Sequence, residues 1–291
     1  MHANQGRVIR AIGGFFDVAD SNGEIFRCYV RGKHQKQNKY LLVGDMVKFT
    51  INEYQQGIIE EILPRDNHFK RPPVANVSQL ITVVSACKPS PDWNLLSRQL
   101  VFAESIGLRS IICLNKKDLV EEEDLKHLYN KLNTFPYERI ITSALTGEGV
   151  EGLKQVIQDH VSLFAGASGV GKSSLLNAIQ PQLELETAEV SSKIKRGRHT
   201  TRRVEIFIIN GGMVVDTPGF SKMDLNAEMV EDIDSFFPEI EEYRPSCKFR
   251  DCFHKNEPGC AVKEAVDNNN ISQMRYDHYL SFLEELEQLR F

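Results

Sequence analysis

One eight-residue segment constrains this chain more than any other feature of its sequence. Residues 166–173 read Gly-Ala-Ser-Gly-Val-Gly-Lys-Ser and match the pattern G-x-x-x-x-G-K-[ST] in full. An apolar run at 160–165 precedes the segment, and a helical pattern at 172–179 follows it. In this context glycines let backbone N–H groups surround phosphates, and the helix N-terminus adds partial positive charge. The segment therefore predicts a phosphate-binding loop in an α/β domain.

Each member of this loop has an expected role. Lys172 is expected to reach the β- and γ-phosphates of a nucleotide, and the Ser173 hydroxyl to bind Mg²⁺. A glycine-rich turn between strand and helix is the alternative interpretation. The predicted nucleotide contacts from this region are Gly166, Ala167, Ser168, Gly169, Val170, Gly171, Lys172, Ser173 and Ser174.

A second motif indicates which base is bound. Asn115-Lys116-Lys117-Asp118 follows the apolar run 110–114. A carboxylate can accept two hydrogen bonds from the N1 and N2 edge of guanine, and adenine offers no such pair of donors. Asp118 is therefore expected to select guanine, with Asn115, Lys116 and Lys117 completing the binding loop. An adenine-specific ATPase or kinase is disfavoured for the same reason.

Two further strand ends carry candidate ligands. Ser143-Ala144-Leu145 resembles the S-A-K loop of GTPases, whose backbone contacts guanine O6, although Leu145 replaces the usual lysine and an ordinary turn is the alternative. Asp216 ends another apolar run, where a carboxylate suits Mg²⁺, and the Gly219 amide suits the γ-phosphate.

Three cysteines and one histidine crowd together near the C-terminus. The pattern Cys247-x4-Cys252-x-His254-x5-Cys260 supplies three thiolates and one imidazole, a closed tetrahedral set for structural Zn²⁺. Free thiols are the alternative. The remaining cysteines lie far apart in apolar surroundings and are expected to be buried free thiols: Cys28, Cys87 and Cys113.

The pattern of apolar and polar segments along the chain changes twice, which predicts three domains. Residues 1–65 carry short β segments and polar turns, which favour an OB-fold barrel. Residues 66–222 alternate apolar strands with helices, which indicates a buried parallel sheet. Residues 223–291 are expected to form a mainly helical zinc-binding module, with a helix at 227–237 and an acidic terminal helix.

The order of the motifs is unusual for a GTPase. In ordinary GTPases the phosphate loop comes first and N-K-x-D follows, whereas here 115–118 and 143–145 precede 166–173. All the parts are present in a cyclically rotated order, which predicts a circular permutation of the α/β domain. With the barrel and the Cys/His cluster, this order resembles the RsgA (YjeQ/YloQ) family of circularly permuted GTPases.

This resemblance implies a GTPase that binds GTP and GDP, with Mg²⁺ and one structural Zn²⁺, and acts on the small ribosomal subunit and its rRNA. It also assigns Gly197-Arg198-His199-Thr200-Thr201 to switch I. Thr200 or Thr201 is then expected to contact Mg²⁺ and the γ-phosphate. His199 is expected to orient water or accept a proton, because Phe220 replaces the usual glutamine; RNA contact or simple exposure is the alternative for His199. The expected catalytic residues are Lys172, His199, Thr200 and Thr201.

Charge patterning gives the remaining expectations. The net charge is −5, but residues 27–39 and 191–203 contain basic residues and no acid, which favours RNA contacts. No apolar run is long enough for a membrane helix, and the first residues lack an apolar signal core, so we expect a cytoplasmic monomer. An RNA-binding GTP switch that acts outside the ribosome is the alternative function.

Overall fold

The computed structural model describes most of the chain. The described residues are 4–30, 41–70, 72–185, 204–216 and 225–290. They divide between two compact units, one within 1–80, 151–164 and 179–220 and the other within 81–150, 165–178 and 221–291. The predicted domain boundaries after residues 65 and 222 stay predictions.

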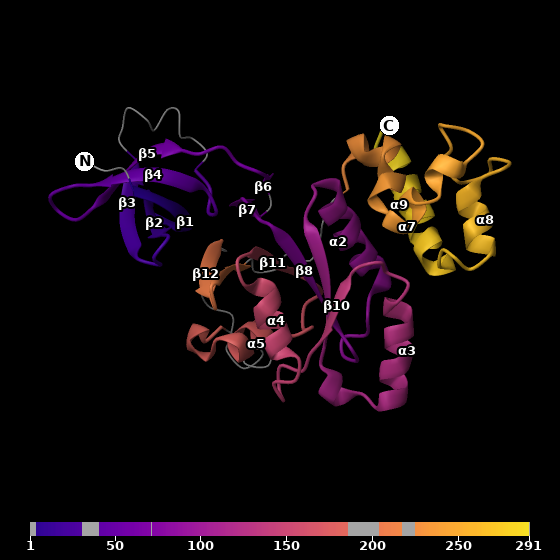
Figure 1. Ribbon diagram of the computed structural model, residues 1–291, viewed down its shortest axis with the longest axis horizontal. Coiled ribbons are helices and arrows are strands. Elements are labelled where there is room, and N and C mark those ends of the chain that lie inside the picture. The colour runs from indigo at the N-terminus through magenta and orange to yellow at the C-terminus, as the bar shows by residue number, and fades with distance from the viewer. Residues whose placement is uncertain (1–3, 31–40, 71, 186–203, 217–224, 291) are drawn as a thin grey trace. The chain divides into compact units, whose positions relative to one another are not determined.

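Five strands of the first unit close into a small barrel (Figure 1). They are β1 (Asn4–Ile12), β2 (Phe15–Asp20), β3 (Ile25–Val30), β4 (Met46–Ile51) and β5 (Gly57–Ile62). β1 pairs with both β2 and β4, and β2 pairs with β3. β5 closes the barrel, because it pairs in parallel register with β3 and in antiparallel register with β4. Alternate residues point inward, and the buried core is Val8, Val18, Cys28, Val47, Phe49 and Ile59. The predicted OB-fold barrel is confirmed.

A small two-stranded sheet follows the barrel in the chain. β6 (His68–Lys70) pairs in antiparallel register with β7 (Pro73–Ala75). The Asn67 side chain closes its base, because it accepts from the Val77 amide at 3.0 Å and donates to the Val77 carbonyl at 2.7 Å. Strands of three residues are too short to show alternation in a sequence.

The other strands of the first unit contain one correction to the predicted parallel sheet. β11 (Val161–Ala165) and β13 (Gly212–Asp216) are parallel, as expected. β12 (Glu205–Ile209) is antiparallel to β13, because only Asn210 and Gly211 connect them and both have positive φ. Two residues can close a hairpin but cannot make a parallel crossover. This unit also contains most of α4 (Val150–Ile157) and the short 3-10 helix η2 (Pro181–Leu183).

The second unit contains the rest of the α/β domain. Its strands lie in the order β10 (Glu138–Ile141), β9 (Arg109–Asn115), β8 (Gln79–Ser85), with β9 and β10 parallel. Its helices are α2 (Trp93–Ser105), η1 (Lys117–Leu119), α3 (Glu122–Leu132) and α5 (Lys172–Ile179). The buried core between strands and helices is Val84, Ala86, Leu96, Leu100, Ile112, Leu114, Leu132 and Phe135. Asp92 caps α2, because its Oδ1 accepts from the Leu95 amide at 2.9 Å.

The C-terminal part of this unit is helical, as predicted (Figure 1, yellow). Its elements are η3 (Ala227–Glu231), η4 (Ile233–Phe236), α7 (Pro238–Glu241), η5 (Arg244–Ser246), α8 (Ala261–Asp267) and α9 (Gln273–Gln288). The single helix predicted at 227–237 is wrong, since two 3-10 helices that meet at Asp232 occupy this stretch. Among the helices of the described residues, none combines the length and apolar character that a membrane crossing needs.

A buried arginine joins this C-terminal part to the α/β core. Arg275 of α9 is 0% exposed, and its Nε donates to Glu239 Oε1 at 2.5 Å. Its Nη1 donates to the Ser97 hydroxyl of α2 at 2.8 Å. The guanidinium carbon lies 4.8 Å from the Phe135 ring centroid and 4.5 Å from that of Phe237. One cation therefore contacts α2, the segment after α3 and the segment of the C-terminal part that contains Phe237 and Glu239.

Removal of this cation is expected to destabilise the protein strongly. Arg275→Met leaves the Glu239 carboxylate buried without its cation, which costs about 3–5 kcal/mol of unfolding free energy. Urea unfolding followed by circular dichroism measures the loss. The double change Arg275→Met with Glu239→Gln is expected to recover part of it.

A surface pair offers a matched control. Arg290 and Glu231 form an exposed ion pair at 2.7 Å, so Arg290→Met is expected to cost less than about 1 kcal/mol. Equal stability of Arg275→Met and Arg290→Met would contradict a structural role for the buried cation.

Candidate functional site

The phosphate loop connects β11 to α5, as the sequence predicts. All three of its glycines have positive φ: +134° at Gly166, +81° at Gly169 and +99° at Gly171. A Cβ on Gly166 would lie 2.2 Å from the Val83 carbonyl oxygen, and one on Gly171 would lie 2.3 Å from Asn115 Nδ2. Only glycine fits these positions, because backbone and side-chain atoms of β8 and β9 lie directly against the loop.

The charged and hydroxyl groups of the loop lie at the start of α5. The Lys172 ammonium folds over the loop and donates to the Gly166 carbonyl at 2.8 Å and the Ala167 carbonyl at 3.0 Å. Ser173 and Ser174 follow in the first turn of α5 and are half-buried. The loop tip is exposed, so its backbone amides are accessible to an anion.

The Asn115 amide ties three loops together at the end of β9. Its Nδ2 donates to the Val170 carbonyl of the phosphate loop at 2.9 Å. Its Oδ1 accepts from the Ala144 amide and from the Thr142 hydroxyl, each at 3.2 Å. The side chain is 1% exposed and both ends of the amide are bonded. The amide therefore fixes N-K-x-D, S-A-L and the phosphate loop in one arrangement.

The rest of the N-K-x-D motif has distinct partners. Lys116 is left-handed, with φ 68°, and its ammonium donates to the Gly169 carbonyl at 2.7 Å and to the Lys88 carbonyl. Lys117 forms an ion pair with Glu148. Motif residues thus contact the tip of the phosphate loop from the side.

Asp118 is exposed at this end of the sheet and is held by one hydroxyl. The buried Ser143 Oγ donates to Asp118 Oδ1 at 2.5 Å, and Ser143 also accepts from the Thr146 amide at 3.1 Å. The Asp118 carboxylate and the S-A-L loop therefore meet at this end of the sheet. This geometry is suited to a purine with N–H donors on one edge.

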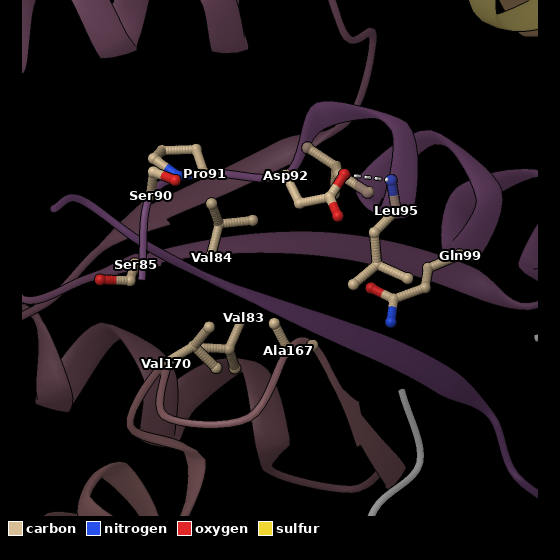
Figure 2. Close-up of a pocket in the computed structure, with 12 residues that line it drawn as sticks. Val83, Val84, Ser85, Ser90, Pro91, Asp92, Leu95, Gln99, Ala167 and Val170 are labelled. Atoms are coloured by element: carbon tan, nitrogen blue, oxygen red, sulfur yellow. Dashed lines mark hydrogen bonds between the residues drawn. The ribbon is translucent and has the colours of Figure 1, made fainter. Parts of the chain in front are cut away.

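A small pocket adjoins the phosphate loop on the α2 side (Figure 2). Val83 and Val84 of β8, Leu95 of α2 and Ala167 of the loop form its apolar walls. Gln99 of α2 also lines it, and its side-chain amide is buried with no hydrogen-bond partner among the described residues. Gln99 therefore places a polar group of α2 close to the phosphate loop.

Other predicted site residues lie outside what the structure describes. Asp216 is the last residue of β13, and its side chain is not described. Gly219 and the switch I residues are not among the described residues, namely His199, Thr200 and Thr201. Most of the basic stretch 27–39 and all of 191–203 also fall outside them. The roles of these residues remain predictions.

The four predicted metal ligands lie together in the C-terminal part. One ligand atom from each of Cys247, Cys252, His254 and Cys260 lies within 4.8 Å of all the others. All four belong to the loop between η5 and α8, and all six cysteines are free thiols. The predicted clustering is confirmed.

The spacing of these atoms fits a tetrahedral zinc ion. Zn–S bonds of ~2.3 Å and Zn–N bonds of ~2.0–2.1 Å place sulfur pairs ~3.8 Å apart and sulfur–nitrogen pairs ~3.5 Å apart. The Cys247 and Cys260 sulfurs are 3.9 Å apart, and His254 Nδ1 is 3.6 and 3.3 Å from them. Burial raises the pKa of Cys252 to about 12 and also raises that of Cys260, so their thiolates need a nearby cation.

Residues far away in the sequence hold this loop in place. Tyr276 and Tyr279 of α9 donate to the carbonyls of His254 and Phe253, at 2.5 and 2.8 Å. Asp234 Oδ2 lies 3.4 Å from His254 Nε2. Sequence reasoning missed these contacts, because no local spacing relates Asp234 or the tyrosines of α9 to the cysteine pattern.

Comparisons with known proteins match this arrangement. Residues 62–226 match the family model described as RsgA GTPase, and residues 5–59 match the RsgA N-terminal domain. A protein of Caldanaerobacter subterraneus subsp. tengcongensis, named small ribosomal subunit biogenesis GTPase RsgA, is 44% identical over 289 residues, which are 99% of this chain and 97% of the relative.

Two solved structures have the same architecture over nearly their whole length. YjeQ from Thermotoga maritima has a TM-score of 0.87 and 38% identity, covering 98% of this chain and 99% of that one. YloQ, described as a circularly permuted GTPase, has a TM-score of 0.83 and 37% identity, covering 99% and 96%. The predicted GTPase class and circular permutation are confirmed. The chain belongs to the RsgA GTPase family.

Proposed function

We propose that this chain hydrolyses GTP to GDP and phosphate while it is bound to the small ribosomal subunit during late subunit maturation. The observation that carries the proposal is the Asn115 amide, which joins the guanine-type loop to the phosphate loop in permuted order. The name of the Caldanaerobacter relative, a small ribosomal subunit biogenesis GTPase, supports the choice of partner. Cytoplasmic location follows from that partner.

The nucleotide roles follow from the geometry described above. Asp118 accepts from the guanine edge, and Asn115 keeps the base loop and the phosphate loop together. Lys172 exchanges its two carbonyl partners for phosphate oxygens, since an ammonium bonds more strongly to an anion than to neutral carbonyls. The donor set Ser173 and Asp216 fits Mg²⁺, which neutralises phosphate charge when bound.

Three further roles belong to residues that lie mostly outside the described parts of the chain. Gly219, Thr200 and Thr201 are proposed to contact the γ-phosphate side of the site, and His199 to orient water or accept its proton. The acid-free stretches 27–39 and 191–203 are proposed to contact rRNA phosphates.

The Cys/His cluster is proposed to hold one structural Zn²⁺. Its ligand set is three sulfurs and one nitrogen with tetrahedral spacing, which leaves no open coordination position for substrate. The ion would stabilise the C-terminal module, because the loop between η5 and α8 has little secondary structure of its own.

The direct test of the proposed function is hydrolysis with purified small ribosomal subunits. Addition of subunits is expected to raise the GTP turnover rate at least tenfold, because binding of a partner can complete a site that lacks the usual glutamine. Phosphate release is measured with GTP and with ATP, and large subunits serve as the control. Equal rates with small subunits, large subunits and no subunits would refute the ribosomal partner.

Removal of the Asp118 carboxylate is expected to abolish base selection. Asp118→Ala should weaken GDP binding at least 100-fold, because the guanine N–H donors lose their charged acceptor. Fluorescent nucleotide titration measures the affinity for GDP and for ADP.

Asp124→Ala on α3 is the matched control, since Asp124 is an exposed acid nearby with no assigned contact to the base. Asp118→Ala should bind GDP no better than ADP, whereas Asp124→Ala should bind GDP like the parent protein. Retained preference for GDP in Asp118→Ala would show that another group selects the base.

A further inference from the structure

A carboxylate outside the cysteine loop lies against the histidine of the metal cluster. Asp234 belongs to η4, twenty residues before His254 in the chain, and is 6% exposed. Its Oδ2 lies 3.4 Å from His254 Nε2, while its Oδ1 accepts from the Ser235 amide at 2.9 Å. The Ser235 amide therefore holds one oxygen of the Asp234 carboxylate, while the other oxygen contacts the imidazole.

The neighbours of the two ring nitrogens of His254 indicate a different role for each nitrogen. The ring is 0% exposed, so bulk solvent does not reach it. Nδ1 lies 3.3 Å from the Cys260 sulfur and 3.6 Å from the Cys247 sulfur, on the side of the cluster. Nε2 lies on the Asp234 side. A neutral imidazole has one N–H donor and one lone pair, and a carboxylate can only accept, so the proton belongs on Nε2.

Local charge supports the same assignment. Three thiolates and a divalent cation leave a net charge of −1, to which Asp234 adds another negative charge. Arg244 Nε lies 3.0 Å from Asp234 Oδ2 and balances this charge. The guanidinium also contacts Glu241 at 3.3 Å, which holds it from the outer side. The Asp234 Oδ2 atom therefore has a guanidinium and the His254 ring nitrogen as its partners.

We propose that Asp234 is a positioning residue for the metal centre. It accepts the Nε2–H of His254, and this hydrogen bond sets both the tautomer and the orientation of the ring. The Nδ1 lone pair is then directed to the metal position among the sulfurs, and this orientation raises the affinity of the cluster for Zn²⁺. The inference rests on the metal site proposed above.

The experiment compares metal affinity in four forms of the full-length protein. These are the parent, Asp234→Asn, Asp234→Ala and, as the matched control, Asp232→Asn, which changes an exposed carboxylate two residues earlier. Zn²⁺ is competed with the chromophoric chelator 4-(2-pyridylazo)resorcinol. Both Asp234 variants are expected to bind Zn²⁺ 10–100-fold more weakly than the parent, and Asp232→Asn within about twofold.

A spectroscopic measurement separates positioning from simple destabilisation. At saturating Co²⁺, the d–d absorption reports a four-coordinate site in each variant, so weaker binding is not loss of the fold. In ¹H–¹⁵N spectra of the zinc-loaded protein, the His254 Nε2–H resonance is expected downfield and protected from exchange in the parent. In Asp234→Ala it should move upfield and exchange faster with water.

Different outcomes would refute the positioning role of Asp234 and the metal site on which that role rests. A parent protein that binds no Zn²⁺ would refute the metal site itself and, with it, the role of Asp234. A parent that binds Zn²⁺ tightly, with Asp234→Ala equally tight or with its Nε2–H resonance unchanged, would overturn the positioning role alone. The expected weakening, confined to the Asp234 variants, supports it.

Discussion

The nucleotide site depends on a single buried amide. Asn115 donates to the phosphate loop and accepts from the S-A-L loop, and these segments are separated by tens of residues along the chain. Because the amide is nearly inaccessible to water, neither end can lose its partner without a large desolvation penalty. In the permuted order of this chain, the contact joins N-K-x-D, which comes first, to the phosphate loop, which follows it.

Helix α2 links this site to the C-terminal module. On one side, Asp92 and Gln99 line the pocket beside the phosphate loop. On the other side, Ser97 contacts Arg275 at 2.8 Å and His278 at 2.7 Å, and Arg98 forms an ion pair with Glu285. Helix α9 in turn holds the cysteine loop through its tyrosines. Polar contacts of α2 with α9, and of α9 with the cysteine loop, therefore lie between the phosphate loop region and the metal cluster.

Local chemistry made much of this molecule predictable from its sequence. Phosphate binding, base selection and metal binding each need particular residue types at short spacings, so residues 166–173, 115–118 and 247–260 are recognisable without a structure. Contacts between distant segments leave no such spacing. Arg275 reads as one more charge on an acidic helix, and Asp234 as part of a short helix, until folding buries them. The antiparallel β12 was missed because an apolar run has the same composition in either direction.

The central claim is that the Asn115 amide makes the separate loops one site, and pyrophosphate tests it most directly. Pyrophosphate engages the phosphate loop and has no base for Asp118 to contact. Calorimetric titration should show at least tenfold weaker pyrophosphate binding in Asn115→Ala, because the Val170 carbonyl loses its donor and the loop loses its support. Leu145→Ala, at a residue 82% exposed in the adjacent loop, should bind like the parent. Unchanged pyrophosphate affinity in Asn115→Ala would contradict the account.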